Sequence, residues 1–334
     1  MYENIFSLEL PVGERLKLVR NRLVPEEYKE LSNSELEKKN LKRISIVTGI
    51  HGDEMEGQYI CYELIKRIEE NRDCLKGIVD IYPAVNMLGL DNAIHTIPKE
   101  RLDMNHIFPG SANGRMMERI AFALTENVLG SSICIDVHGS DIFSRESLQV
   151  RLNEDFADKI LPYARLINAN VIWINPNPTV SDSTLTHSLN CMGVPAFAVE
   201  CGIGNSINKA DGDKIVEGIF NVMSEFEIWS GEKYSVSEAP VCNDDGVEFI
   251  RADKSGLFIS EISDFAELKE GQLIGRIVDV MKNEVLQEVR ANHDGILFTI
   301  REFPMVYEGA LLARILIYRD SEDSVKKCID EPVL

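Results

Sequence analysis

The sequence predicts an α/β domain followed by a small all-β domain, and three observations support this prediction. Up to about residue 230, short apolar runs alternate with amphipathic segments, a pattern typical of strands and helices in a mostly parallel sheet. A polar stretch containing Gly and Pro then interrupts the pattern. Beyond it, short alternating segments are separated by turn residues, as in a small barrel or sandwich. The length of 334 residues is sufficient for two domains.

The first part of the chain contains five apolar runs with the length of buried strands. They cover residues 44–47, 79–82, 133–137, 170–174 and 196–199. Two further segments, residues 54–70 and 213–228, place apolar side chains at helical spacing and predict amphipathic helices. In sheets of this kind, ligands bind beyond the carboxyl ends of the strands, so chemistry is expected where these runs end.

The second part of the chain has a different texture. Residues 229–240 are polar and contain chain breakers, which indicates a linker. Short strands are then predicted at 256–259, 273–278, 284–289, 295–298 and 310–317. We therefore expect a first domain over residues 1–235, a small β-barrel domain over residues 236–320 and a charged tail over residues 321–334.

Charge and cysteine usage restrict the partners and the compartment. A formal net charge of −20 argues against nucleic acid and against anionic membranes, because both are bound by clustered Lys and Arg. The seven cysteines include no CxxC pair, which predicts thiols in a reducing compartment. The N-terminus has no signal-peptide pattern, and no run of about 18 apolar residues occurs. These features predict a soluble cytoplasmic protein.

Histidine and carboxylate side chains follow two of the predicted strands. His51 and Glu54 are three positions apart after the run 44–47, and His138 follows the run 133–137. Two imidazole nitrogens and one carboxylate form a protein ligand set typical of catalytic zinc, which keeps a fourth position for water. The same set binds several other divalent metals, and a single histidine at a strand end is more often a structural hydrogen-bonding group.

Three carboxylates near these residues have alternative interpretations. Glu200 ends the run 196–199 and is placed to take a proton from a water molecule, or its carboxylate is satisfied by backbone groups at the strand end. Asp53 and Asp136 either orient a ligand histidine or have a local role, which for Asp53 would be the N-cap of the following helix.

Five motifs in order resemble the succinylglutamate desuccinylase/aspartoacylase family, a branch of the zinc carboxypeptidase superfamily. They lie at residues 49–54, 82–86, 102–110, 136–139 and 193–200, and the resemblance covers roughly residues 40–230. It implies a zinc-carboxypeptidase-like mixed, mostly parallel sheet flanked by helices. It also implies one Zn²⁺ per chain held by His51, Glu54 and His138, with Glu200 as general base and then general acid.

The activity that this resemblance implies is hydrolysis of an amide bond. The expected substrate is a small N-acyl amino acid or a related acylated amine, attacked by metal-activated water. Two alternatives stay open: carboxypeptidase-like cleavage of a short peptide or conjugate, and a non-catalytic metal-binding scaffold. The sequence leaves open the acyl group, the amine and whether the chain forms a homo-oligomer.

The substrate loop departs from the family pattern. Members of the family have an arginine that polarises the substrate carbonyl and an Asn-Arg pair that binds the substrate carboxylate. Here the matching positions hold His95 and the pair Asn105-His106. An imidazole cannot make the two-pronged carboxylate contact of a guanidinium. Substrate binding is therefore expected from Asn105, His95 and His106, or from a charge on Arg101 in the same loop.

The second domain resembles a biotinyl/lipoyl barrel. Lys282 lies near the turn where such domains carry a modified lysine, but Asn283 replaces the usual apolar residue after it. We therefore expect a barrel with a packing or oligomer-forming role, with a swinging-arm carrier as the alternative.

Overall fold

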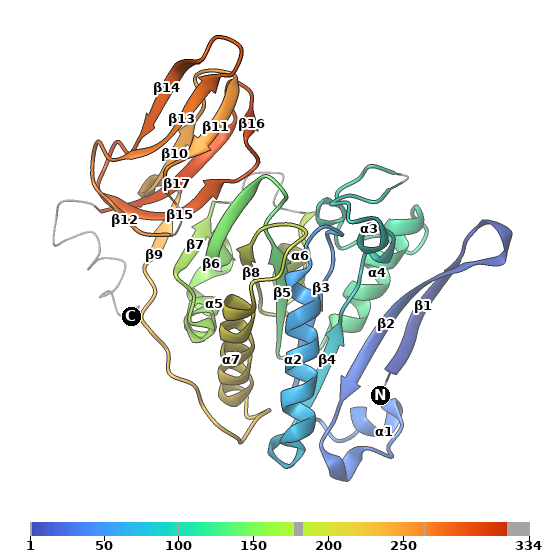
Figure 1. Cartoon of the computed structure of the whole chain (residues 1–334). Helices are drawn as coiled ribbons and strands as arrows, with labels where there is room; N and C mark the ends of the chain where they lie inside the picture. Colours follow the sequence, from blue (N-terminus) through green and yellow to red (C-terminus); the bar gives the residue numbers. More distant parts are fainter. Residues whose placement is uncertain (1, 99, 177–182, 263–264, 319–334) are drawn as a thin grey trace.

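The computed structural model describes residues 2–98, 100–176, 183–262 and 265–318 (Figure 1). The first part of the chain contains the following strands and helices: β1 (Tyr2–Glu9), β2 (Arg15–Leu23), α1 (Asn33–Glu37), β3 (Arg43–Thr48), α2 (Glu56–Glu70), β4 (Ile78–Tyr82), α3 (Met87–Asn92), α4 (Met116–Val128), β5 (Ile133–Gly139), β6 (Ser144–Asn153), α5 (Ala157–Ala164), β7 (Val171–Asn175), α6 (Leu185–Cys191), β8 (Ala196–Gly202) and α7 (Lys209–Glu225).

A large mixed sheet forms the centre of the molecule. Its main path runs β1-β2-β4-β3-β5-β8-β6 and then continues into strands of the C-terminal part, while β7 pairs with β6. The four strands β4, β3, β5 and β8 are parallel neighbours. The predicted mixed, mostly parallel α/β fold is confirmed, and all five predicted strands and both predicted helices are present.

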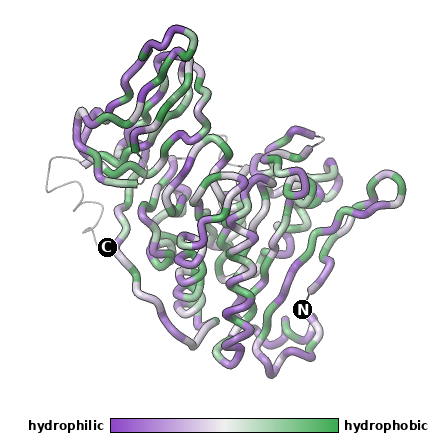
Figure 2. The backbone as a smooth tube through the Cα atoms, viewed as in Figure 1, coloured by the Kyte–Doolittle hydropathy of each residue, from purple (hydrophilic) through white to green (hydrophobic). Residues whose placement is uncertain are grey.

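Helices cover both faces of this sheet. The apolar sides of α2, α5 and α7 pack on one face, and α4 and α6 pack on the other. Figure 1 shows α2 and α7 side by side in front of the strands, and in Figure 2 polar and apolar residues alternate along α2. This alternation follows from a helix with one face in the core and the other in water. Within the described residues, no helix combines the length and the apolarity needed to cross a membrane.

The C-terminal strands form a second sheet and also extend the first. They are β9 (Val241–Asn243), β10 (Val247–Arg251), β11 (Gly256–Ser260), β12 (Glu267–Leu268), β13 (Leu273–Asp279), β14 (Glu284–Arg290), β15 (Gly295–Arg301), β16 (Met305–Val306) and β17 (Leu311–Ile317). Four of them build the smaller sheet in the order β14-β13-β11-β16. The five short strands predicted after the linker correspond to β11, β13, β14, β15 and β17. The predicted tail over residues 321–334 lies outside the described residues.

Two strand pairings join the C-terminal part to the rest of the molecule. Strand β15 pairs with β6 in antiparallel fashion, and β9 pairs with β7 in parallel. Trp173 of β7 packs there against Phe298 of β15, inside a small apolar core shared by both parts, and its ring also contacts the more exposed Phe249 of β10. These pairings hold side chains of β15 and β17 beside β6. The domain limit at residues 235 and 236 stays a prediction.

Candidate active site

The metal-ligand candidates meet at the carboxyl ends of β3 and β5. His51 and Glu54 lie in the loop between β3 and α2, and His138 lies in β5 directly opposite Glu200 of β8. Gly52 allows this loop to pack closely, because a Cβ at this position would lie only 2.0 Å from the backbone of Gly89. The parallel register thus brings residues from three separate segments to one edge of the sheet, as the sequence predicted.

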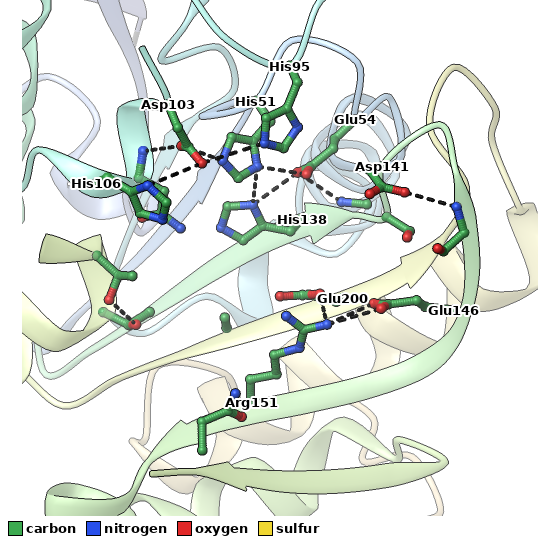
Figure 3. A pocket seen from close by; sticks show the side chains of 18 of the residues that line it. His51, Glu54, His95, Asp103, His106, His138, Asp141, Glu146, Arg151 and Glu200 are labelled. Atoms are coloured by element: carbon green, nitrogen blue, oxygen red, sulfur yellow. Dashed lines mark hydrogen bonds and ion pairs between the residues drawn. The ribbon is translucent and has the colours of Figure 1, made fainter. Parts of the chain in front are cut away.

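Three side chains converge tightly at this edge (Figure 3). His51 Nδ1 lies 2.7 Å from Glu54 Oε1, and His138 Nδ1 lies 2.9 Å from Glu54 Oε2. The two Nδ1 atoms are 3.3 Å apart. All three residues are buried, with at most 8% of any of them exposed. A buried set of two imidazoles and one carboxylate is a donor set that can hold a metal cation.

A carboxylate stands behind each of these two histidines. His51 Nε2 lies 3.0 Å from Asp103 Oδ1, and His138 Nε2 lies 3.0 Å from Asp136 Oδ2. The second contact has the distance of an ion pair but not the alignment of a hydrogen bond, and both oxygens of the buried Asp136 lack a hydrogen-bond partner among the described residues. Carboxylates in these positions fix the ring orientation of metal-binding histidines.

Only one of these two orienting carboxylates was considered in that role from the sequence. Asp136 lies where one of its two interpretations placed it, whereas Asp103 was not predicted. Asp53 contacts His95 instead of a ligand candidate, and the N-cap of α2 is Met55, so the capping role expected as an alternative for Asp53 is wrong.

His95 lies directly against this group. Its ring stacks on that of His51 with 3.8 Å between the centroids, and its Nδ1 is 3.1 Å from Asp53 Oδ1. Atoms of His51, Glu54 and His95 all lie within 4.8 Å, so they form a second group able to hold a cation. Burial lowers the pKa of His95, but Asp103 and Asp53 outweigh burial and raise its pKa to about 10. The neighbouring carboxylates therefore favour the protonated form of His95.

Neighbouring charges shift the pKa values of the candidate ligands. Burial opposes the negative charge of Glu54, yet His51 and His138 outweigh it and hold the pKa of Glu54 well below its usual range. The pKa of His138 is raised despite burial, because Asp136 and Glu54 surround it. Metal ligands must be deprotonated, so a bound cation would replace these ring protons at the same donor atoms.

A second group of charges surrounds Glu200. Arg151 Nη2 lies 2.6 Å from Glu200 Oε2 and also donates to both oxygens of Glu146, at 3.1 and 3.0 Å (Figure 3). Burial is the largest influence on Glu200 and raises its pKa to about 8, with Arg151 opposing this shift and Glu146 adding to it. Glu200 is thus held in place by a guanidinium instead of by the backbone groups considered as an alternative.

Both groups line one cavity of about 430 Å³. Three of the expected substrate-binding residues, His95, Asn105 and His106, contribute to its wall, whereas the exposed Arg101 lies outside that lining. Asn105 Oδ1 also accepts a hydrogen bond from the backbone of Leu185, which ties the substrate loop to α6. A cavity of this volume is suited to a small molecule.

The arginines of the cavity were not predicted from the sequence. Arg151 comes from β6, while Arg301 and Arg314 come from the C-terminal strands β15 and β17. A signal for β6 exists, since Leu148, Val150 and Leu152 alternate with polar residues. No signal of this kind links β17 to the site, because the link depends on strand pairing across a long stretch of chain.

The model of the succinylglutamate desuccinylase/aspartoacylase catalytic domain matches residues 40–226. The chain belongs to this family. The chain is also similar to the N-alpha-acetyl-L-2,4-diaminobutyric acid deacetylase of Halomonas elongata, at 25% identity over 264 residues, with 77% of this chain and 76% of that protein covered.

Solved structures of family members share the fold. A succinylglutamate desuccinylase/aspartoacylase from Rhodobacter sphaeroides superposes with a TM-score of 0.76 at 20% identity, covering 92% of this chain and 91% of that one. The product-bound ectoine utilization protein EutE (DoeB) from Ruegeria pomeroyi gives a TM-score of 0.75 at 19% identity, covering 92% and 90%. Each superposition covers 92% of this chain, so the likeness in fold extends beyond the catalytic domain matched at residues 40–226.

Proposed function

We propose that this family member is a zinc-dependent amidohydrolase that cleaves a small N-acyl amino acid or related acylated amine into a free amine and a carboxylic acid. The observation that carries the proposal is the convergence of His51, Glu54 and His138 in the same cavity as Glu200. The similarity to the Halomonas elongata deacetylase supports this reaction class. We also place the protein in the cytoplasm, because its cysteine usage is typical of a reducing compartment.

The residues that would hold the zinc ion are His51 and His138, each through Nδ1, and Glu54 through its carboxylate. His138 is preferred to His95 as the third ligand because its Nδ1 lies 2.9 Å from Glu54, while His95 Nδ1 contacts Asp53. When bound, zinc lowers the pKa of a coordinated water and polarises the scissile carbonyl. A set of two histidines and one glutamate suits this chemistry because it leaves a coordination position open.

Glu200 is the proton-transfer group in this proposal. It takes a proton from the attacking water and returns it to the leaving nitrogen, which departs as an amine. A carboxyl with its pKa near neutrality can perform both transfers. Burial and the charge of Glu146 raise the pKa of Glu200 from its ordinary acidic value toward that range. Arg151 holds Oε2 of Glu200, so the orientation of the carboxylate is set before the substrate binds.

Substrate contacts are assigned to His95, Asn105 and His106, which line the cavity. His95 lies where other members have an arginine, and a ring N–H of His95 can stabilise negative charge that develops on the substrate carbonyl oxygen. Arg101 stays a prediction from the sequence, because its exposed position lies outside the cavity wall. The cavity volume favours a small acylated amine over a longer peptide.

The proposal is tested by incubating the zinc-loaded protein with a panel of N-acetyl and N-succinyl amino acids, including N-alpha-acetyl-2,4-diaminobutyrate, and with dipeptides. Release of free amine is measured, with zinc-loaded Glu200→Gln as the matched control. We expect amine release from at least one acyl amino acid and little from the control. Equal release by both proteins, or cleavage of the dipeptides alone, would contradict the proposed function.

A further inference from the structure

Glu146 of β6 is a buried carboxylate held by two guanidinium groups, one from the same strand and one from the distant strand β17. Arg151 Nη2 donates to both of its oxygens, and Arg314 Nη1 of β17 donates to Oε1 at 2.6 Å. Gln149 Nε2 adds a hydrogen bond of 2.8 Å. Only 4% of Glu146 is exposed. A carboxylate buried to this degree requires such compensation, so each donor matters for its position.

Strand register brings Arg314 to this place. Thr299 of β15 pairs with Glu146 of β6 on one side and with Arg314 of β17 on the other. The three residues therefore lie in a row across three adjacent strands. Arg314 Nη1 also lies 3.5 Å from Thr299 Oγ1, which keeps its side chain along that row.

Trp173 of β7 supports both guanidinium groups. The Cζ atom of Arg151 lies 5.4 Å from the centre of its ring, and that of Arg314 lies 5.2 Å from it. Both distances fall within the range of cation–π attraction. The same ring packs against Phe298 of the C-terminal strands, so the two arginines and the junction between the two parts share one support.

We propose that Arg314 is a positioning residue of the active site, acting through Glu146 and Arg151 on Glu200. Arg314 neutralises Glu146 and fixes its carboxylate, and Glu146 in turn orients the guanidinium that holds Glu200. Without Arg314, Arg151 becomes the only cation paired with Glu146 and moves toward it, so Glu200 loses its fixed orientation. The C-terminal β strands are then part of the catalytic apparatus, a conclusion that rests on the proposed function.

The test compares Arg314→Met, Arg314→Lys and Arg145→Met in the zinc-loaded protein. Arg145 is the matched control because its Nε makes a 2.7 Å ion pair with Glu302 across the same β6–β15 junction, while its side chain lies outside the wall of the active-site cavity. Values of kcat and KM are measured on the best N-acyl amino acid of the panel. Thermal unfolding midpoints and zinc content report separately on the fold and on the metal site.

We expect Arg314→Met to lower kcat about tenfold or more with KM changed less than about threefold, since misplacing a reacting group acts mainly on the chemical step. Arg314→Lys should recover part of this loss because it restores the charge, and Arg145→Met should retain its kcat within about twofold. Equal kcat values for Arg314→Met and Arg145→Met would overturn the inference. A rise in KM alone would also overturn it, because it would identify Arg314 as a substrate contact.

If no acyl amino acid is cleaved, crystal structures of the two methionine variants still test the positioning role of Arg314. In that case the proposed function fails, and the position of Arg151 still tests the positioning role. We expect Arg151 to leave Glu200 in the Arg314→Met variant and to stay in place in the Arg145→Met variant. An unchanged contact between Arg151 and Glu200 in both variants would refute the positioning role regardless of activity.

Discussion

The two halves of the active-site cavity are built in different ways. In one half, His51 and Glu54 come from a single loop and meet His138 from the neighbouring strand β5. In the other half, Glu146 is paired with Arg314, which lies 168 positions away in the sequence. The first half is a local motif beside a strand, and the second half is completed only when the C-terminal strands pair with β6 and bring Arg314 to Glu146.

The halves also balance charge differently. The first half gathers nitrogen and carboxylate donors that would share a cation, whereas the second half neutralises its carboxylates with guanidinium groups of the chain itself. Substitutions in the first half should therefore change metal content. Substitutions in the second half should change the rate of hydrolysis and leave the metal content unchanged. The following predictions test this division, beginning with the largest expected effect.

The Glu54→Ala variant is expected to lose both metal and activity. It removes the carboxylate that bridges the two histidines, so two neutral ligands are left for the cation. Elemental analysis of purified protein should give close to one zinc per chain for the parent and a small fraction of that for the variant. The control is Glu63→Ala on α2, which removes an ion pair with Lys66 away from the cavity and should keep its zinc. If the Glu54→Ala protein still contained zinc, Glu54 would not be a metal ligand and the proposed difference between the two halves would be wrong.

The Glu200→Gln variant should keep its zinc and lose most of its activity. A general acid–base group typically contributes about 10²- to 10⁴-fold to the rate, and an amide cannot take a proton from water. The decrease should appear in kcat, measured on the best substrate of the acyl amino acid panel. Loss of zinc from this variant would show that Glu200 belongs to the metal half of the cavity, contrary to the division proposed here.

Removing the negative charge of Asp136 should weaken metal binding without abolishing it. Partners that orient a ligand histidine are typically worth about 10- to 100-fold in metal affinity, and Asp136 lies 3.0 Å from His138 Nε2. Zinc affinity of the Asp136→Asn variant is measured by competition with a chelator, beside Asp158→Asn on the exposed side of α5 as control. Identical affinities for the two variants would mean that Asp136 has no part in metal binding.

The same contrast explains which parts of the molecule could be predicted from the sequence. The strands β3, β5 and β8 are nearly continuous apolar runs, so both the fold class and the residues at their ends were predictable. Strand β6 was missed because its alternating polar residues resemble a surface segment.

The arginine half could not be predicted for a related reason. The polar residues Glu146 and Arg151 of β6 face the cavity, and Arg314, which pairs with Glu146, is reached only through pairings between strands that are distant in the sequence. Register between distant strands is set by tertiary packing, which a single sequence does not display. Asp103 was missed in the same way, since its contact with His51 joins two loops that are 52 positions apart.

The smallest expected effect comes from Arg151→Lys, which keeps the positive charge next to Glu200 but loses the planar fork. All of these contacts are made by one nitrogen, Arg151 Nη2, and the tetrahedral ammonium of a lysine directs its hydrogens differently, so Glu200 is held less firmly. We expect kcat to fall by about tenfold or less, with zinc content and zinc affinity unchanged.

Arg165→Lys, at an exposed ion pair with Glu238, serves as control for the loss of a guanidinium. A fall in zinc affinity of Arg151→Lys would mean that the two halves act as a single network. An unchanged kcat would mean that Glu200 does not depend on Arg151 for its orientation. Arg314 could then not position Glu200 through Arg151.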